Sequence, residues 1–504
     1  MEFIELADYP LPGGHVIEWL PTATTQWTDW PRDQRAASHN HEQHLRDALA
    51  RSADPRQCWL GHAFRVDGTL DVTAWRVALD RWIDRHEGLR THVAIENGRP
   101  ARYTAPPGTI GVHPVAAGSP ASTVATHHLV QRLVDEATSP LRWPAYVCVT
   151  IGTDAGFTVL LAADHSIMDG YSTIATGGEL RAIYDEVRAG IPSAPDDPGS
   201  YLDFCDRERA VAAVVTTADP AVAIWDAFLT GATPAPGSPR EDSRRDNWPW
   251  DAPSWDAPAC THAPTLHHVT ATPVVSGYRT EAPRPSAQRA LAIEVLGSAG
   301  ADAAAAHAGR QRQGLFAVLL AAFAATAAEN GAGQDFRTVV PLHTRSEPRW
   351  ANTLGWFVGL APFALNCTAA QRISDLIGPA GTEIRRVRVA ATVPFARVCE
   401  LLEIRPRISF MVSYMDCRFA PASGTWLDTD TRWLRGRAAS DDEYYFWFLR
   451  TPAGVSLNIR YPGNERATHD VHTHVLRLRE LLTEFAAYGD ATIRPARGAP
   501  LTWK

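Results

Sequence analysis

The chain of 504 residues has 48 Lys and Arg against 56 Asp and Glu, and its formal net charge of −8 argues against a nucleic-acid-binding protein, which normally carries a basic face. Hydrophobic residues make up 45% and charged residues 21%, the composition of a globular protein that can bury a large core. The longest apolar run, Leu315 to Ala328, falls short of the roughly 20 residues that a membrane-spanning helix needs, so it predicts a buried helix.

The start of the chain carries acidic residues and no apolar segment, so we expect no signal peptide. The cysteines are an odd number and form no C-x-x-C pair, which predicts reduced, mostly buried thiols in a cytoplasmic protein rather than a zinc site. They are Cys58, Cys148, Cys205, Cys260, Cys367, Cys399 and Cys417.

Residues 1–35 are rich in Pro and Trp without clear periodicity, and they predict an extended lead-in. Asp71 is a candidate N-cap for the helix that follows it, in which Trp75, Leu79 and Trp82 recur at helical spacing. The other elements expected in this part are a helix at 38–51, a strand at 58–67, strands at 89–95 and 101–104, and a helix at 121–137.

Two apolar runs, Ala145 to Ile151 and Phe157 to Ala163, have the length of strands and are separated by a glycine-containing turn. They predict an antiparallel hairpin in a buried sheet. The second strand leads directly into Asp164-His165-Ser166-Ile167-Met168-Asp169-Gly170, and a helix is expected at 171–188.

Residues 192–200 predict a linker, and 231–285, rich in Pro, Trp, His and Ser, predict a long loop or insertion. The remaining elements expected are helices at 201–213, 219–230, 300–331, 370–390, 394–403 and 467–488, and strands at 288–295, 336–341, 354–365, 407–415, 442–450 and 454–461. The sequence therefore predicts an α/β protein with a domain at 1–195, linker helices and an insertion at 196–285, and a second domain at 286–504.

His165 stands where a buried strand ends and a glycine-containing turn begins, a usual position for a functional side chain on a rigid scaffold. An imidazole, with a reference pKa of about 6.5, suits general-base catalysis. It can take the proton of a hydroxyl or amine that attacks a thioester and return it to the thiolate. A single histidine is more often structural, so this interpretation depends on the surrounding motifs.

Asp169 has two interpretations. It orients His165 as in a catalytic triad, or it pairs with an arginine and fixes the loop, and the second is favoured. Gly170 allows close approach of the backbone, so its N–H is a candidate hydrogen-bond donor to a developing oxyanion.

Several segments follow the order in which motifs occur in condensation domains. Asp164–Gly170 resembles H-H-x-x-x-D-G, Arg85–Thr91 resembles R-H-E-x-L-R-T, and Leu354–Pro362 resembles G-x-F-V-N-x-x-P. Further similar segments are Val393–Val398, Ser409–Asp416, Asp203–Cys205 and Trp225–Leu229. The chain thus resembles acyltransferases of the condensation-domain superfamily from about residue 38 to 490. The lead-in tryptophans, G-W-F-V-G-L-A-P and S-F-M-V-S-Y-M-D are most similar to the actinobacterial polyketide-associated (Pap-type) branch.

The resemblance implies two chloramphenicol-acetyltransferase-like (CAT-like) subdomains arranged in a V, with His165 at the middle of a tunnel between them. An acyl group would pass from a CoA or carrier-protein thioester to a hydroxyl of a sugar, lipid or polyketide-type acceptor, through a tetrahedral intermediate and without an acyl-enzyme. Acyl-CoA or a phosphopantetheinyl carrier would be the co-substrate, and an acyl carrier protein a candidate partner. No metal, permanently bound cofactor or nucleic acid is implied, and we expect a monomer.

Residue roles follow from the same resemblance. His165 matches the second, catalytic histidine of the motif, whereas Asp164 replaces the first and is expected to be structural. Arg345 matches the R-x-x-E region and is the expected partner of Asp169. Three further candidates for lining the tunnel or contacting the oxyanion are Ser413, Tyr414 and Trp356, and plain packing is at least as good an account of Ser413 and Tyr414.

Two other functions remain open. One is a free-standing amide-forming condensation enzyme of natural-product biosynthesis, because the sequence does not separate an amine from a hydroxyl acceptor. The other is a catalytically silent module that binds a carrier protein, which the departure at Asp164 keeps open. A metal site at His39, His41, Glu42 and His44 is disfavoured, since the spacing predicts a solvated helix start.

Overall fold

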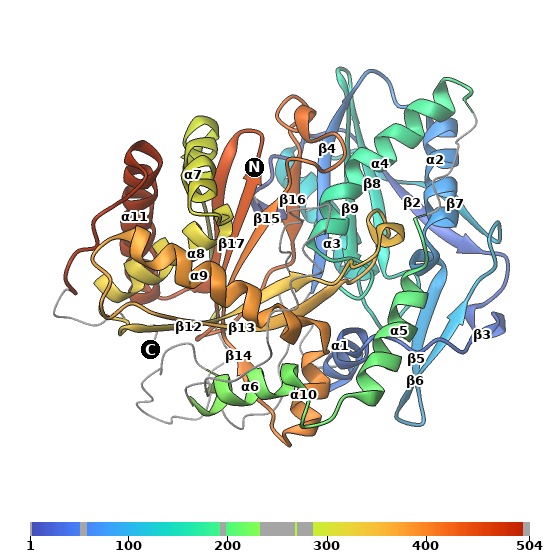
Figure 1. Cartoon of the computed structure of the whole chain (residues 1–504). Helices are drawn as coiled ribbons and strands as arrows, with labels where there is room; N and C mark the ends of the chain where they lie inside the picture. The colour runs from blue at the N-terminus through green and yellow to red at the C-terminus, as the bar shows by residue number, and fades with distance from the viewer. Residues whose placement is uncertain (1–2, 51–57, 192–197, 232–267, 270–285, 497–504) are drawn as a thin grey trace.

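The computed structural model describes residues 3–50, 58–191, 198–231, 268–269 and 286–496. Each half of the chain builds one large sheet covered by helices, and the two sheets lie side by side in Figure 1. The predicted mixed α/β class is therefore confirmed. None of the helices within these ranges has the length and apolar character needed to cross a membrane.

The first sheet has seven strands and is antiparallel apart from its β1–β16 pair. In spatial order they are β1 (Phe3–Glu5), β16 (Arg432–Arg435), β4 (Trp59–Asp67), β9 (Gly156–Asp164), β8 (Tyr146–Thr153), β2 (His15–Ala23) and β7 (Ile110–Gly118). The helices of this half are α1 (His39–Ala50), α2 (Val72–Arg85), α3 (Thr123–Ala137) and α4 (Gly170–Arg188). A small sheet of β3 (Arg32–Asp33), β6 (Arg99–Thr104) and β5 (Thr91–Glu96) lies beside them.

The β8–β9 hairpin is continuously apolar because both faces of the sheet are covered. Side chains alternate between the faces of a strand. Leu161 and Ala163 pack in the cluster that holds the apolar residues of α2 and α4, whereas Leu160 and Ala162 pack in the cluster that contains α3. All residues of β9 are buried. This strand is thus a rigid support for the residues that follow its end.

The second sheet has six strands around the larger core. In spatial order they are β11 (Gln288–Gly297), β18 (Gly454–Pro462), β17 (Tyr444–Thr451), β15 (Phe410–Asp416), β12 (Asp335–His343) and β13 (Val358–Asn366). The helices after α4 are α5 (Tyr201–Val214), α6 (Pro220–Thr230), α7 (Ser298–Arg310), α8 (Leu315–Glu329), α9 (Ile373–Val387), α10 (Phe395–Leu401) and α11 (Glu465–Tyr488). Every residue of α8 is buried, as its apolar sequence predicts. A short pair joins β10 (His268–Val269) and β14 (Arg407–Ile408).

Two segments of the second half cross to the first. Strand β16 is hydrogen-bonded between β1 and β4, although it follows β15 in the chain. The segment between β12 and β13 runs over to the start of α4, where Arg345 meets Asp169. These crossings join the two halves through main-chain pairing and buried polar contacts rather than through a linker alone.

The sequence missed three features of this architecture. The lead-in contains β2, a nine-residue strand, and neither β7 nor β16 was expected. The strand predicted at 354–365 begins only at Val358, because the preceding residues reach toward α4. Most of the predicted insertion at 231–285 lies outside the described residues.

The expectation of reduced thiols holds for four described cysteines, Cys148, Cys205, Cys367 and Cys399. It is wrong for Cys58, which is disulfide-bonded.

Candidate active site

His165 lies in the short loop between β9 and α4, directly after the buried strand. Its backbone N–H donates to the carbonyl of Cys58 at 2.8 Å, next to the start of β4. Ile167 N–H donates to the carbonyl of Asp164 at 3.0 Å, which closes a turn around His165. The position of the histidine backbone is therefore set by the sheet and by a hydrogen-bonded turn.

The imidazole of His165 is only 1% exposed and stacks on Trp356, with ring centroids 4.2 Å apart and an interplanar angle of 29°. Within the described part of the chain, neither ring nitrogen has a hydrogen-bond partner. Burial disfavours the charged ring and lowers the pKa of His165 to about 4, although the nearby carboxylates of Asp164 and Asp169 act in the opposite direction. The ring is therefore neutral at pH 7 and able to accept a proton.

Asp169 anchors the loop from its other end. It is fully buried, caps α4 by accepting from Ser172 N–H at 2.8 Å, and accepts from Phe357 N–H at 3.0 Å. Arg345 Nη2 lies 3.2 Å from both of its carboxylate oxygens. These contacts occupy the carboxylate and connect it to the second half of the chain, which is what an anchoring role requires.

Arg345, the partner of Asp169, is itself fixed by several contacts. Its Nη1 donates to the carbonyls of Trp350 at 2.8 Å and Thr353 at 2.5 Å. Its guanidinium lies 4.1 Å from the centroid of the Phe357 ring and 5.0 Å from that of Tyr171. A planar guanidinium can satisfy several carbonyls and a carboxylate at once, so the segment from 345 to 357 is fixed against α4.

Asp164 also has a buried partner. His44 Nε2, on α1, lies 3.0 Å from both carboxylate oxygens, and Ser166 N–H donates to Oδ1 at 2.9 Å. Burial alone would raise the pKa of Asp164, but the charge and hydrogen bond of His44, together with the hydrogen bonds of Ser166, outweigh it and lower the pKa. Sequence reasoning missed this role of His44. The predicted solvated helix start is wrong, because His39 and His44 are buried. No metal-binding group of side chains occurs among the described residues.

The other candidates lie in different surroundings. Gly170 is the first residue of α4, and helix N-termini present N–H groups that lack intrahelical acceptors. Tyr414 sits in the core of the second half, where its ring stacks on Phe316 with centroids 5.5 Å apart. Ser413 is buried next to it on β15. Of the sequence-predicted residues, the structure brings Asp164, Asp169, Arg345 and Trp356 into the surroundings of His165.

The R-H-E-G-L-R-T segment contacts both α4 and the segment that carries Trp356. Arg85 Nε and His86 Nε2 approach Glu179 of α4 at 2.7 Å and 2.8 Å. Leu354 N–H donates to His86 Nδ1 at 3.4 Å, so this histidine connects α4 to the segment that carries Trp356. Sequence reasoning used these residues only as a family signature and did not find Glu179.

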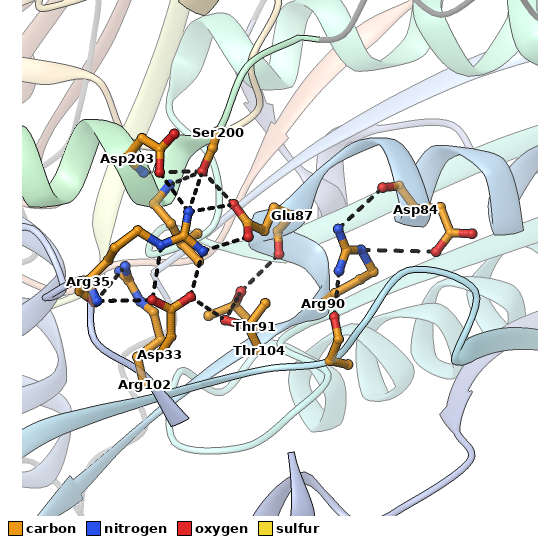
Figure 2. Close-up of polar contacts among 12 residues, drawn as sticks. Asp33, Arg35, Asp84, Glu87, Arg90, Thr91, Arg102, Thr104, Ser200 and Asp203 are labelled. Atoms are coloured by element: carbon orange, nitrogen blue, oxygen red, sulfur yellow. Dashed lines mark hydrogen bonds and ion pairs between the residues drawn. The ribbon is translucent and has the colours of Figure 1, made fainter. Parts of the chain in front are cut away.

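Glu87 of the same segment belongs to the polar network of Figure 2. Arg35 lies at its centre and donates to Asp33 at 2.6 Å, Glu87 at 2.7 Å and Asp203 at 2.7 Å. Ser200, the N-cap of α5, donates to Glu87 as well. The lead-in, the motif segment and α5 are therefore held together by one partly buried arginine.

A pocket of about 30 Å³ borders Ser166 and Ile167, the residues next to His165, and is also lined by His41, Arg102 and Tyr201. This volume holds no more than a water molecule or two. His165 itself is only 1% exposed, so the described structure leaves little room for a substrate beside the imidazole.

Comparisons with known proteins identify similar chains. A family model described as Condensation domain matches residues 50–232. Acyltransferase PapA3 of Mycobacterium tuberculosis is 24% identical over 96% of this chain and 96% of its own length. A linear gramicidin synthase protein of Brevibacillus parabrevis is 22% identical over 69% of this chain and 4% of its own length. Among solved structures, PapA2 acyl transferase has a TM-score of 0.80 at 20% identity, covering 96% of this chain and 100% of that one.

The fold is therefore that of the condensation domains, with two CAT-like subdomains, as the motifs implied. The first condensation domain of the calcium-dependent antibiotic synthetase has a TM-score of 0.63 at 16% identity, over 92% of this chain and 98% of its own. Within this class the resemblance to Pap-type acyltransferases is confirmed, because PapA3 and PapA2 match nearly the whole length.

Proposed function

We propose that the protein is an acyltransferase that moves an acyl group from a CoA or carrier-protein thioester to a hydroxyl of a sugar, lipid or polyketide-type acceptor, with His165 as general base. The observation that carries this proposal is the state of the imidazole, whose two buried ring nitrogens lack partners within the described residues. Buried polar atoms are normally hydrogen-bonded, so two unused nitrogens in a loop rich in hydrogen bonds favour a role in binding a substrate.

The proposed reaction begins when His165 takes the proton of the acceptor hydroxyl. The hydroxyl oxygen bonds to the thioester carbonyl carbon and gives a tetrahedral intermediate with a negative oxygen. The N–H of Gly170, at the N-terminus of α4, is the candidate donor to that oxygen. When the C–S bond breaks, the imidazolium returns the proton to the thiolate, so that an ester and a thiol leave and no acyl-enzyme forms.

Trp356 covers one face of the imidazole, so the substrate must reach its nitrogens at the ring edge. Because His165 is only 1% exposed, binding requires part of its surroundings to move. Substrate-induced opening and closure of this kind also excludes water, which would otherwise hydrolyse the thioester.

The test is an assay of thiol release from a series of acyl-CoAs and an acyl-loaded carrier protein, with a hydroxyl acceptor, for the wild type and His165→Ala. A positioned general base contributes about 10²- to 10⁴-fold, so the variant should lose that factor in kcat. His128→Ala, at an exposed position of α3, is the matched control and should retain full activity. Equal thiol release from wild type and His165→Ala would contradict the proposal.

The similarity to a linear gramicidin synthase supports a second candidate, transfer to an amine to form an amide. The same assay with matched alcohol and amine acceptors separates the two, because the product is an ester or an amide. A third outcome, binding of a carrier protein with no transfer to either acceptor, would support the silent carrier-binding module instead.

A further inference from the structure

The residue that departs from the motif, Asp164, has a specific buried partner. His44 and Asp164 are 4% and 1% exposed, and the imidazole faces both carboxylate oxygens at 3.0 Å. A buried carboxylate is costly unless it is paired and hydrogen-bonded, and here the pairing comes from a helix 120 residues earlier in the chain. The pair therefore fixes the end of β9 against α1.

The same histidine also contacts the aromatic ring that covers His165. The His44 ring meets Trp356 edge-on, with centroids 5.8 Å apart at 81°, and Trp356 stacks on His165 at 4.2 Å. The indole Nε1 has no hydrogen-bond partner within the described residues. Ring contacts, rather than a hydrogen bond, must therefore hold the indole in place.

We propose that His44 and Asp164 form a positioning pair for His165, which holds the imidazole loop through Ser166 and holds Trp356 against the imidazole face. The pair reaches His165 by two routes, through the loop backbone and through the indole of Trp356. Asp164 accepts from Ser166 N–H on the far side of His165, and His44 packs against the indole that covers the ring. This inference rests on the proposed role of His165 and adds residues that set its orientation.

The pair also balances charge beside the base. Burial lowers the pKa of His165, a charged His44 lowers it further, and the carboxylates of Asp164 and Asp169 raise it. Asp169 is already paired with Arg345. Removing His44 leaves the charge of Asp164 facing His165 without compensation, so the pKa of His165 rises. Replacing Asp164 by Asn removes that carboxylate and does not raise it.

The experiment uses His44→Phe, which keeps an aromatic ring beside Trp356 but strands Asp164, and Asp164→Asn, which keeps hydrogen-bonding atoms but removes the charge. We expect kcat to fall about 10- to 100-fold in each, with KM changed less than about threefold, because small misplacement of a catalytic group has effects of that size. The double variant should lose less than the product of the two single effects, since both remove one interaction.

The matched control is His39→Phe. His39 is on the same helix and is buried, but its ring pairs with Glu208 at 3.3 Å rather than with Asp164. It should retain kcat even if it lowers Tm. A readout independent of activity is an NMR titration of the imidazole Cε1–H of His165, assigned with His165→Gln. Its pKa should rise in His44→Phe and not in His39→Phe.

Equal losses of kcat in His44→Phe and His39→Phe, or an unchanged His165 titration in His44→Phe, would overturn the positioning pair while leaving the proposed function intact. Failure of the proposed function looks different, because His165→Ala would then release thiol as fast as the wild type.

Discussion

At the scale of single residues, His165 is a buried histidine in the loop between β9 and α4. Burial lowers its pKa to about 4, so the ring is neutral at pH 7. A base of low pKa takes up a proton reluctantly, and the carboxylates of Asp164 and Asp169 offset part of this by stabilising the imidazolium. In the proposed mechanism, the balance between burial, the charge of His44 and these two carboxylates sets how readily His165 takes up a proton.

The pH dependence of kcat/KM should reflect this lowered pKa. The rate rises as His165 loses its proton, so activity is lost only as pH falls toward about 4. With an ordinary pKa of about 6.5, kcat/KM at pH 5.5 would be roughly tenfold below its plateau. We expect less than about a twofold difference between pH 5.5 and 7.5, measured with circular dichroism at each pH to verify that the protein is folded. A tenfold fall at pH 5.5 would contradict the neutral, buried base.

At the scale of elements, α4 is the support on which the site depends. Asp169 caps it, Glu179 binds Arg85 and His86, and Gly177 allows it to lie close to β4. A Cβ at Gly177 would lie 2.1 Å from Nε2 of His62. His62 cannot easily turn aside, because it is 2% exposed and bonded through Nδ1 to the carbonyl of Thr173 at 2.9 Å.

Gly177→Ala should therefore destabilise the protein, although replacing Gly by Ala within a helix usually increases stability. Overpacking costs about 1–3 kcal/mol, which exceeds the gain of about 1 kcal/mol in helix propensity. Gly309→Ala on α7 is the control, because no atom lies within 4 Å of its added Cβ, and it should stabilise slightly. Urea unfolding measures both. A free energy of unfolding for Gly177→Ala equal to that of Gly309→Ala would show that α4 and β4 can separate without cost.

At the scale of the whole molecule, the two halves meet at buried polar contacts. Arg345 reaches from the second half to Asp169 of the first, and β16 extends the first sheet with residues from the second half. Trp433 of β16 is fully buried and packs on Trp426 and Phe3 with centroids 5.0 Å and 5.5 Å away. The halves are therefore expected to unfold together.

Arg345→Met should cost about 3–5 kcal/mol, because it leaves the buried carboxylate of Asp169 without its cation. The double variant Arg345→Met with Asp169→Asn should recover part of this loss, since the stranded charge is gone. Arg349→Met is the control from the same segment. The ion pair of Arg349 with Glu347 is half exposed, so its loss should cost less than about 1 kcal/mol. Similar denaturation midpoints for Arg345→Met and Arg349→Met would show that the contact between the halves is not an anchor.

The sequence by itself determined most of the helices, the β8–β9 hairpin and the place of the candidate base. Apolar runs without polar alternation marked β8 and β9 as buried on both faces, and the end of β9 located His165. Helical spacing located α2, and Asp71 caps it as expected. These features depend on local periodicity and on short motifs, which can be read from neighbouring residues.

Only the tertiary structure decided which side chains meet. Nothing local to α1 indicates that His44 binds Asp164, 120 residues away, and its polar neighbours made it resemble a solvated helix start. The short segment of β16, with an arginine at each end, did not suggest a strand that pairs with β4, and Arg35 gave no sign of its contact with Glu87. Such contacts form because folding brings together segments whose polar groups must be satisfied once buried. The local sequence shows which residues carry polar groups, and the packing of the two halves determines which residue becomes the partner of each.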